Sequence, residues 1–411
     1  MGSAPRKRRF STGRVWGLLF ALLSLSALAT TLAIRSHDPQ QVRVARGVID
    51  GSFHPIAGKF APDETKLEDC DADQRCLEQA FGNLAYTAGP RPALALFNRR
   101  RAVDKTIAAD CHRIAHTIGS AALAHFNGNV AQTYSHGSAS CASGYYHGIL
   151  ERAFSQVGSQ RALVRAARSL CRGASVRRRG FLDYQCTHGL GHGLMIQTGY
   201  DLPTALSVCE RLQTRWDEVS CTGGVFMENG STVYGLRSQW LKDDDPLYPC
   251  ARIKFRHRAS CYLRVTTQIL RTNHFDWPET AHSCGTLAHK WLRYCFRSYG
   301  RDTVNYAGGK AESILRLCRL ARSAEGQCLY GAARTIADRD ANADRAAGFC
   351  RRADLPHQSS CFAGLGVVIG LLRPTAAERE KACEGLTRTY VHACTKEAAS
   401  EVAWNGRGAW G

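Results

Sequence analysis

The chain has 411 residues, of which 44% are hydrophobic, and it carries 54 Lys and Arg against 35 Asp and Glu. This apolar content is sufficient for a large core and excludes a globally disordered chain. The length is typical of two or three domains, or of one array of repeats.

The N-terminus predicts export. Residues 1–14 form a basic tail, and residues 15–34 carry no charge. Twenty helical residues at about 1.5 Å each span about 30 Å of hydrocarbon, and the preceding positive charge keeps the N-terminus inside. We expect one transmembrane anchor here, with a cleaved signal peptide as the alternative. Either way, residues 35–411 are expected outside the cytoplasm, in the periplasm or extracellular space, or secreted if the leader is cleaved. No second span is expected.

Eighteen cysteines agree with export, because an oxidising compartment permits disulfides and an even count permits complete pairing. Their spacing favours pairs between neighbours in the chain, with pairing across repeats left open. The predicted pairs are Cys70/Cys76, Cys111/Cys141, Cys171/Cys186, Cys209/Cys221, Cys250/Cys261, Cys284/Cys295, Cys318/Cys328, Cys350/Cys361 and Cys383/Cys394.

The cysteine pairs recur about every 33–34 residues in the second half of the chain, which indicates stacked supersecondary units. An amphipathic stretch precedes each pair's first cysteine, and a small-residue apolar run follows the second. Both have helical spacing, so we expect each bridge to tie the end of one helix to the start of the next. We therefore predict an all-α fold: a disulfide-stapled array of helical hairpins, either an α-solenoid or an α/α toroid-like ring, after one N-terminal transmembrane or signal helix.

This fold divides the exported chain into four parts. Residues 35–65 are polar and contain three prolines, which is typical of a stalk. Residues 66–235 hold the first repeats and a cluster of His and Glu, residues 236–401 hold the later repeats, and residues 402–411 form a tail.

Seven of the fifteen histidines lie between residues 112 and 192. Three motifs there each place two potential metal ligands four residues apart, so that both lie on one face of a helix. The pairs are His112/His116, His147/Glu151 and His188/His192.

The repeat brings these motifs into register. When the units are aligned on their second cysteine, His147 and His192 both stand six residues beyond it, and His188 stands two beyond. Stacked helices lie about 8–10 Å apart, so we expect these imidazoles to be neighbours. Glycine recurs three residues beyond the cysteine, which predicts close helix approach. The aligned face of the later units has neither His nor Glu and shows no visible chemistry.

We predict a transition-metal centre, with zinc, copper or iron favoured by imidazole donors. Disulfides consume all the cysteines, the absence of C-x-x-C-H excludes covalent haem, and no nucleotide-binding motif is convincing. The predicted ligands are His112, His116, His147, His188 and His192. Glu151 and Glu228 are candidate catalytic bases, and Tyr145, Tyr146 and Asn229 are candidate outer-shell or substrate contacts.

Several functions fit these features, and the motifs match no family that we recognise. The first is a membrane-tethered metal-dependent enzyme, hydrolytic or redox. The alternatives are an extracytoplasmic scaffold, a copper- or zinc-handling protein, an acid–base site without metal, and purely structural histidines. Beyond the membrane itself, we expect an anionic envelope polymer or a protein as partner, since export makes nucleic acid an unlikely one.

Overall fold

A computed structural model describes residues 43–45, 57–138, 140–141, 143–155, 157, 159–171, 180–231, 236–306, 309–339 and 341–403. The predicted tail at residues 1–14, the anchor at 15–34, most of the stalk and most of the C-terminal tail lie outside the described residues. The predicted repeats fall largely within them.

The fold is all-helical, as predicted: 73% of the residues are in helices, and the described residues form twenty α-helices, two 3₁₀ helices and two short strands that pair with each other. The elements are β1 (Arg43–Ala45), η1 (Leu67–Asp69), α2 (Gln74–Ala88), α3 (Pro90–Val103), α4 (Lys105–Ala109), α5 (Cys111–His125), α6 (Val130–Ser135), α7 (Gly144–Phe154), α8 (Gln160–Leu170), α9 (Phe181–Gln197), α10 (Leu202–Cys209), α11 (Arg215–Asn229), β2 (Leu236–Ser238), α12 (Phe255–Tyr262), α13 (Thr266–Thr272), α14 (Trp277–Gly285), α15 (His289–Tyr306), α16 (Ala311–Arg319), η2 (Arg322–Ala324), α17 (Glu325–Arg339), α18 (Asp344–Cys350), α19 (Leu355–Leu372), α20 (Ala376–Leu386) and α21 (Val391–Ala403).

Short polar side chains begin many of these helices. The carboxylate of Asp73 accepts the backbone N–H of Cys76 at the start of α2, and Asp201 caps α10 in the same way. At the start of α11, Thr214 and Asp217 cap each other's backbone reciprocally. These bonds satisfy N–H groups that have no partner inside the helix, and so they fix where each helix begins.

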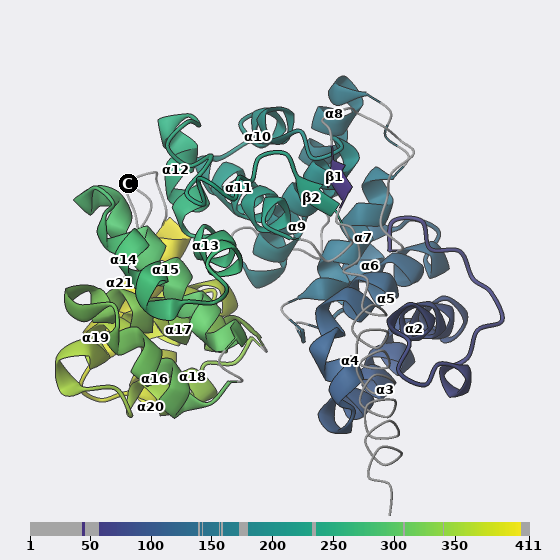
Figure 1. The fold of residues 1–411 in the computed structure, drawn as a ribbon. Coiled ribbons are helices and arrows are strands. Elements are labelled where there is room, and N and C mark those ends of the chain that lie inside the picture. The colour runs from purple at the N-terminus through teal and green to yellow at the C-terminus, as the bar shows by residue number, and fades with distance from the viewer. Residues whose placement is uncertain are drawn as a thin grey trace, which may run out of the picture. The chain divides into compact units, whose positions relative to one another are not determined.

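The longer helices contact one another in chain order (Figure 1). α5 packs between α2 and α7, α7 packs on α9, and α9 packs on α11. In the second half, α15, α17, α19 and α21 form a similar succession, and α19 also touches α9. Between the two groups, the shorter helices α12 and α13 stand where the other units have one long helix.

Nine disulfides join the cysteines in the predicted neighbour pairs, and no described cysteine is free. Pairing across repeats, the alternative, does not occur among them. Nine bridges indicate an oxidising, extracytoplasmic compartment. The bridges are Cys70–Cys76, Cys111–Cys141, Cys171–Cys186, Cys209–Cys221, Cys250–Cys261, Cys284–Cys295, Cys318–Cys328, Cys350–Cys361 and Cys383–Cys394.

The position of the second cysteine in each unit corrects the prediction that the bridge ties the end of one helix to the start of the next. The second helix was expected to start at this cysteine, but in most units it begins several residues earlier. The bridge therefore fastens the first or second turn of that helix rather than its first residue. In α11 the Thr214 cap starts the helix ahead of the cysteine. The second cysteines that lie inside a helix are Cys186 in α9, Cys221 in α11, Cys261 in α12, Cys295 in α15, Cys328 in α17, Cys361 in α19 and Cys394 in α21.

Glycines permit the close approach of the histidine-bearing helices. A Cβ on Gly148 of α7 would lie 1.8 Å from the carbonyl oxygen of His116 on α5. A Cβ on Gly224 of α11 would lie equally close, at 1.8 Å, to the carbonyl oxygen of His188 on α9. Gly224 stands three residues beyond its cysteine, as does Gly144, whose Cβ would lie 2.5 Å from the carbonyl oxygen of His112. Because no side chain fits at these positions, the recurrent glycine does bring these helices into backbone contact.

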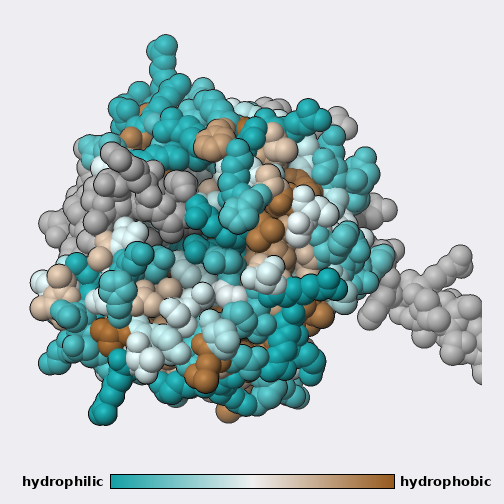
Figure 2. All heavy atoms as spheres, turned by 90° about the vertical axis from the view of Figure 1, so that its left-hand side faces the viewer, coloured by the Kyte–Doolittle hydropathy of each residue, from teal (hydrophilic) through white to brown (hydrophobic). Residues whose placement is uncertain are grey.

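One described helix, α19, is long and apolar enough to cross a membrane by length and composition. The sequence predicts no second span, and 56% of this helix is buried inside the protein, where it packs on α17 and α21. The face drawn in Figure 2 is mostly hydrophilic, with its apolar side chains in small separate groups.

Candidate metal centre

Three neighbouring helices supply the histidine cluster. His112 and His116 lie on α5, His147 lies on α7, and the other two members lie on α9. All are buried except His112, which is partly buried. Each i, i+4 pair lies on a described helix, as its spacing predicts, so both rings of a pair share one helix face.

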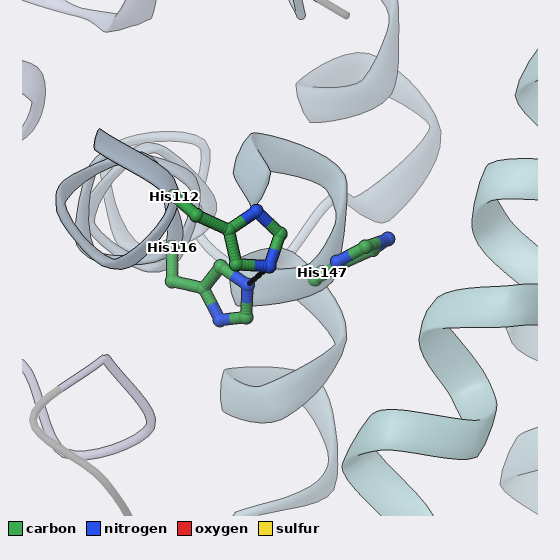
Figure 3. A group of neighbouring side chains, drawn as sticks. All are labelled: His112, His116 and His147. Atoms are coloured by element: carbon green, nitrogen blue, oxygen red, sulfur yellow. Dashed lines mark hydrogen bonds between the residues drawn. The ribbon is translucent and has the colours of Figure 1, made fainter. Parts of the chain in front are cut away.

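The packing of these helices brings the rings together. The ring of His147 stacks on that of His192, with centroids 4.6 Å apart, as the repeat alignment predicts. It also lies 5.5 Å from the ring of His112 and 5.6 Å from that of His188. Figure 3 shows His112 and His116 facing each other, with His147 beside them on the neighbouring helix.

The five histidines form two groups that could hold a metal ion. One consists of His112, His116 and His147, and the other of His147, His188 and His192. Within each group the ligand atoms lie within 4.8 Å of one another, and His147 belongs to both. The cluster therefore offers donors for one ion or, through the shared ring, for two.

Hydrogen bonds at Nδ1 fix the direction of four of the rings. The Nδ1 of His112 lies 2.7 Å from the carbonyl oxygen of Cys141, and the Nδ1 of His188 lies 3.2 Å from that of Ser220. Since a carbonyl oxygen only accepts, both Nδ1 atoms carry the proton and donate it. In a neutral imidazole the other nitrogen, Nε2, then presents a lone pair.

Two carboxylates fix the ring direction of His116 and His192 through their Nδ1 atoms. The Nδ1 of His116 lies 2.6 Å from Oε1 of Glu151, and the Nδ1 of His192 lies 2.9 Å from Oε2 of Glu228. Because an ionised carboxylate accepts, these rings also turn an Nε2 lone pair away from their partners. The buried Nε2 of His192 and both ring nitrogens of His147 have no hydrogen-bond partner in the described part of the chain.

The shortest distance between two of these Nε2 atoms is the observation that indicates a bound cation. The Nε2 atoms of His112 and His116 lie 3.0 Å apart. A hydrogen bond between them would require one ring to donate from Nε2, although both already donate from Nδ1. Only a cation between them, a proton or a metal ion, relieves the repulsion of two facing lone pairs. Two imidazoles bound to one tetrahedral zinc place their nitrogens about 3.3 Å apart, which is close to this spacing.

The pKa values argue against the proton. Burial, and then the charge that a protonated His116 would carry, lower the pKa of His112 to about 3. Burial, and then His192, lower the pKa of His116 to about 3. Burial also holds the pKa values of His147 and His188 well below the ordinary range. At neutral pH these four rings are uncharged, which is the form that binds metal.

Glu151 and Glu228, the two candidate catalytic bases, each lie against the Nδ1 of a histidine of the cluster. Glu228 accepts hydrogen bonds from His192 and, at 2.6 Å, from the hydroxyl of Tyr200. Burial alone would raise the pKa of Glu228, but the bonds from His192 and Tyr200 outweigh it and lower the pKa. Carboxylates behind ligating histidines fix the ring orientation and increase ligand basicity in known metal sites.

The three other predicted site residues make contacts outside the cluster. The hydroxyl of Tyr145 donates to the carbonyl oxygen of Thr133, and the ring of Tyr146 lies against that of Tyr134 in α6. Asn229 accepts a hydrogen bond from Ser238 at 2.6 Å, which ties α11 to β2. None of the three lines the two cavities beside the cluster. They support the packing around the site.

Two cavities open beside the cluster, and arginines from the later units line both. The first is lined by His147 and His188 together with Arg264, Arg301 and Arg334. The second is lined by three further histidines of the cluster and again by Arg264 and Arg301. The later units thus contribute charged side chains to the space beside the cluster, although their aligned face has neither His nor Glu.

The alignment of the units on their second cysteine contains a sequence signal for two of these arginines. Arg301 and Arg334 stand six residues after the second cysteine of their units, the position of His147 and His192 in the earlier ones. The aligned position thus contributes to the cavities in both halves: His147, Arg301 and Arg334 line the first, and His192 and Arg301 line the second. The alignment alone does not predict the arginine lining. Only the structure reveals that α15 and α17 border the same cavity as α7 and α9.

No family model, no curated protein and no solved structure matches this chain. The site is interpreted from its own chemistry: five clustered imidazoles that could hold a metal ion, two orienting carboxylates, and cavities through which a ligand can approach.

Proposed function

We propose that the protein is an exported metalloenzyme whose transition-metal centre is held by the five clustered histidines. The observation that carries the proposal is the direction of the Nδ1 hydrogen bonds. Four rings donate outward, so four Nε2 lone pairs converge in a buried space, with two of them 3.0 Å apart. Buried acceptors without donors are unfavourable unless a cation joins them.

An all-imidazole donor set suits zinc, copper or iron. An ion held here supplies Lewis-acid activation of water and of a substrate oxygen, or electron transfer. The chain's own residues orient the ligands and admit the substrate. Glu151 and Glu228 keep His116 and His192 in the donating tautomer, and the adjoining cavity admits the substrate. We favour hydrolysis, because the arginine-lined cavity suits a polar substrate with a leaving group.

The location and architecture belong to this proposal. We propose a membrane anchor at residues 15–34, a stalk over 35–65 and stacked hairpin units over 66–401. The neighbour-pair disulfides and the chain-order contacts of the long helices support the stacking. The buried position of His147 favours a resident metal over one held for delivery, since its ring is 1% exposed.

Elemental analysis tests the metal centre. The full chain is purified without chelator, and we expect about one or more equivalents of zinc, copper or iron. His147→Ala, which removes a donor from both groups, loses most of that metal. His357→Ala, which lies beside Glu325 outside the cluster, retains it.

Less than about a tenth of an equivalent of every transition metal, both as purified and after incubation with these ions, contradicts the proposal. Absorption spectra of the oxidised and reduced protein then separate the two chemistries. A spectrum that changes on reduction identifies a redox centre, and a colourless zinc protein supports hydrolysis.

A further inference from the structure

The cavity that contains His147 and His188 holds more positive than negative charge. Four partly buried arginines line it: Arg264, Arg297, Arg301 and Arg334. Two carboxylates stand against them. Asp302 pairs with Arg301 at 2.8 Å, and Asp338, the one carboxylate among the described lining residues, interacts with Arg334 and then with Arg264. Two guanidinium charges therefore remain without a matching carboxylate.

Arg297 and Arg264 differ in how they are held. The guanidinium of Arg297 donates to Gln327 and lies 3.7 Å over the ring of Tyr330. No hydrogen bond or ion pair to another described residue holds the guanidinium of Arg264. Burial, and then the charge of Arg301, lower the pKa of Arg264 to about 10, so the side chain stays charged at neutral pH. Asp338 acts on this charge only without direct contact. A half-buried charge that no hydrogen bond or ion pair compensates is unfavourable in the unliganded protein.

The position of Arg264 in the repeat is also exceptional. It stands three residues after the second cysteine of its unit, where Gly189, Gly224, Gly331 and Gly364 stand in other units. Those glycines permit close helix packing. In the unit of Arg264 the helix is interrupted between α12 and α13, and the arginine occupies the interruption. This unit thus loses a continuous helix and places five hydrogen-bond donors on the cavity lining.

A second donor on the same lining has no partner. The indole N–H of Trp216 is buried and makes no hydrogen bond with the described residues, and the residue itself is 3% exposed. Donors without acceptors require a ligand that is rich in acceptors. Guanidinium groups match the planar fork of a carboxylate and the oxygens of a phosphoryl group.

We infer that this cavity binds an oxyanion, a phosphoryl or carboxylate group, at Arg264 beside the histidine cluster. Tyr184, Leu263 and Val367 on the lining accommodate a small apolar or aromatic body attached to it. As a statement about the substrate of the metal centre, this inference rests on the proposed function. The binding itself needs only the cavity and Arg264.

Calorimetric titration of the full chain, with its disulfides intact, tests the inference with three probes of one size: phenylphosphonate, benzoate and benzyl alcohol. We expect at least one anion to bind about tenfold or more tightly than the neutral alcohol. The two anions distinguish a phosphoryl from a carboxylate ligand. Bound metal is measured in every sample.

Two variants of Arg264 separate loss of anion binding from loss of folding, because metal content is measured in each. Arg264→Gln removes the charge, and Arg264→Gly installs the residue that aligned units carry. Both are expected to weaken anion binding about tenfold or more with metal content unchanged. Arg91→Gln, an exposed arginine of α3, is the matched control and keeps the wild-type affinity.

Equal affinity of wild type and both Arg264 variants for both anions overturns the inference, as does equal binding of anions and alcohol. A chain that takes up no transition metal even after incubation with the ions, but still binds an anion through Arg264, supports the inference and contradicts the proposed function. A metal-loaded chain without Arg264-dependent affinity supports the proposed function and overturns the inference.

Discussion

Glu228 offers the sharpest test of how the centre is built, because the chain contains its own control. Glu228 accepts the Nδ1–H of His192 at 2.9 Å and the hydroxyl of Tyr200 at 2.6 Å. Glu228→Gln keeps an acceptor but removes the negative charge. A hydrogen bond to a charged group contributes about 1.5–3 kcal/mol, and loss of such orienting partners weakens metal binding about 10–100-fold. These two ranges agree, since tenfold corresponds to about 1.4 kcal/mol.

The control is Glu210→Gln. Glu210 accepts a hydrogen bond from His257 at 2.7 Å, and this histidine lies outside both metal-binding groups. Zinc affinity is measured by competition with a chromophoric chelator at pH 7, after thermal melting has shown that both variants are folded. We expect Glu228→Gln to bind zinc about 10–100-fold more weakly and Glu210→Gln to bind it as the wild type does. Equal zinc affinity of the two variants would refute the orienting role of Glu228.

Three further predictions concern the cluster. His147→Ala, measured by elemental analysis, lowers bound metal more than alanine at any other ring of the cluster, since His147 alone belongs to both groups; equal losses would contradict this. Gly148→Ala is expected to destabilise the protein by about 1–3 kcal/mol or more in urea unfolding, because its Cβ meets a backbone oxygen, whereas Gly285→Ala, with no atom within 4 Å, changes stability by about 1 kcal/mol at most. In metal-free protein, His112 and His116 have pKa values of about 3 when folded, against about 6.5 in the unfolded chain. Their contribution to the free energy of unfolding is therefore complete above about pH 6.5 and is lost as the pH falls towards 3. Urea unfolding between pH 7 and 4 should show a loss of about 1.4 kcal/mol per pH unit for each group, and a flat profile would contradict it.

Local pattern was sufficient for the helices and the disulfides. The i, i+4 spacing placed His112 and His116 on one helix face, and the cysteine spacing selected the neighbour pairs. The repeat alignment also predicted that His147 and His192 are neighbours, and their rings stack. Where a helix begins was less certain, because it depends on capping residues: α11 begins at the Thr214 cap, ahead of its cysteine.

Longer-range features were not accessible to the same reasoning. The role of Glu228 depends on its contact with His192, thirty-six positions earlier in the chain, and on Tyr200 behind it. The arginine side of the cavity required knowing that α15 and α17 border the same space as α7 and α9. The hydrogen bond from the hydroxyl of Tyr145 to Thr133 was likewise not accessible, because the place of Tyr145 near His147 in the sequence says nothing of the direction of its side chain.

The scatter of the donors along the chain has a consequence for assembly. The five rings span residues 112 to 192 and come from three helices, and two disulfides, Cys111–Cys141 and Cys171–Cys186, tie those helices to the chain beside them. An unfolded polypeptide has no such constellation, so ion capture and folding are coupled. If the chain crosses the membrane before it folds, its metal is acquired only afterwards, from whatever ions that compartment contains.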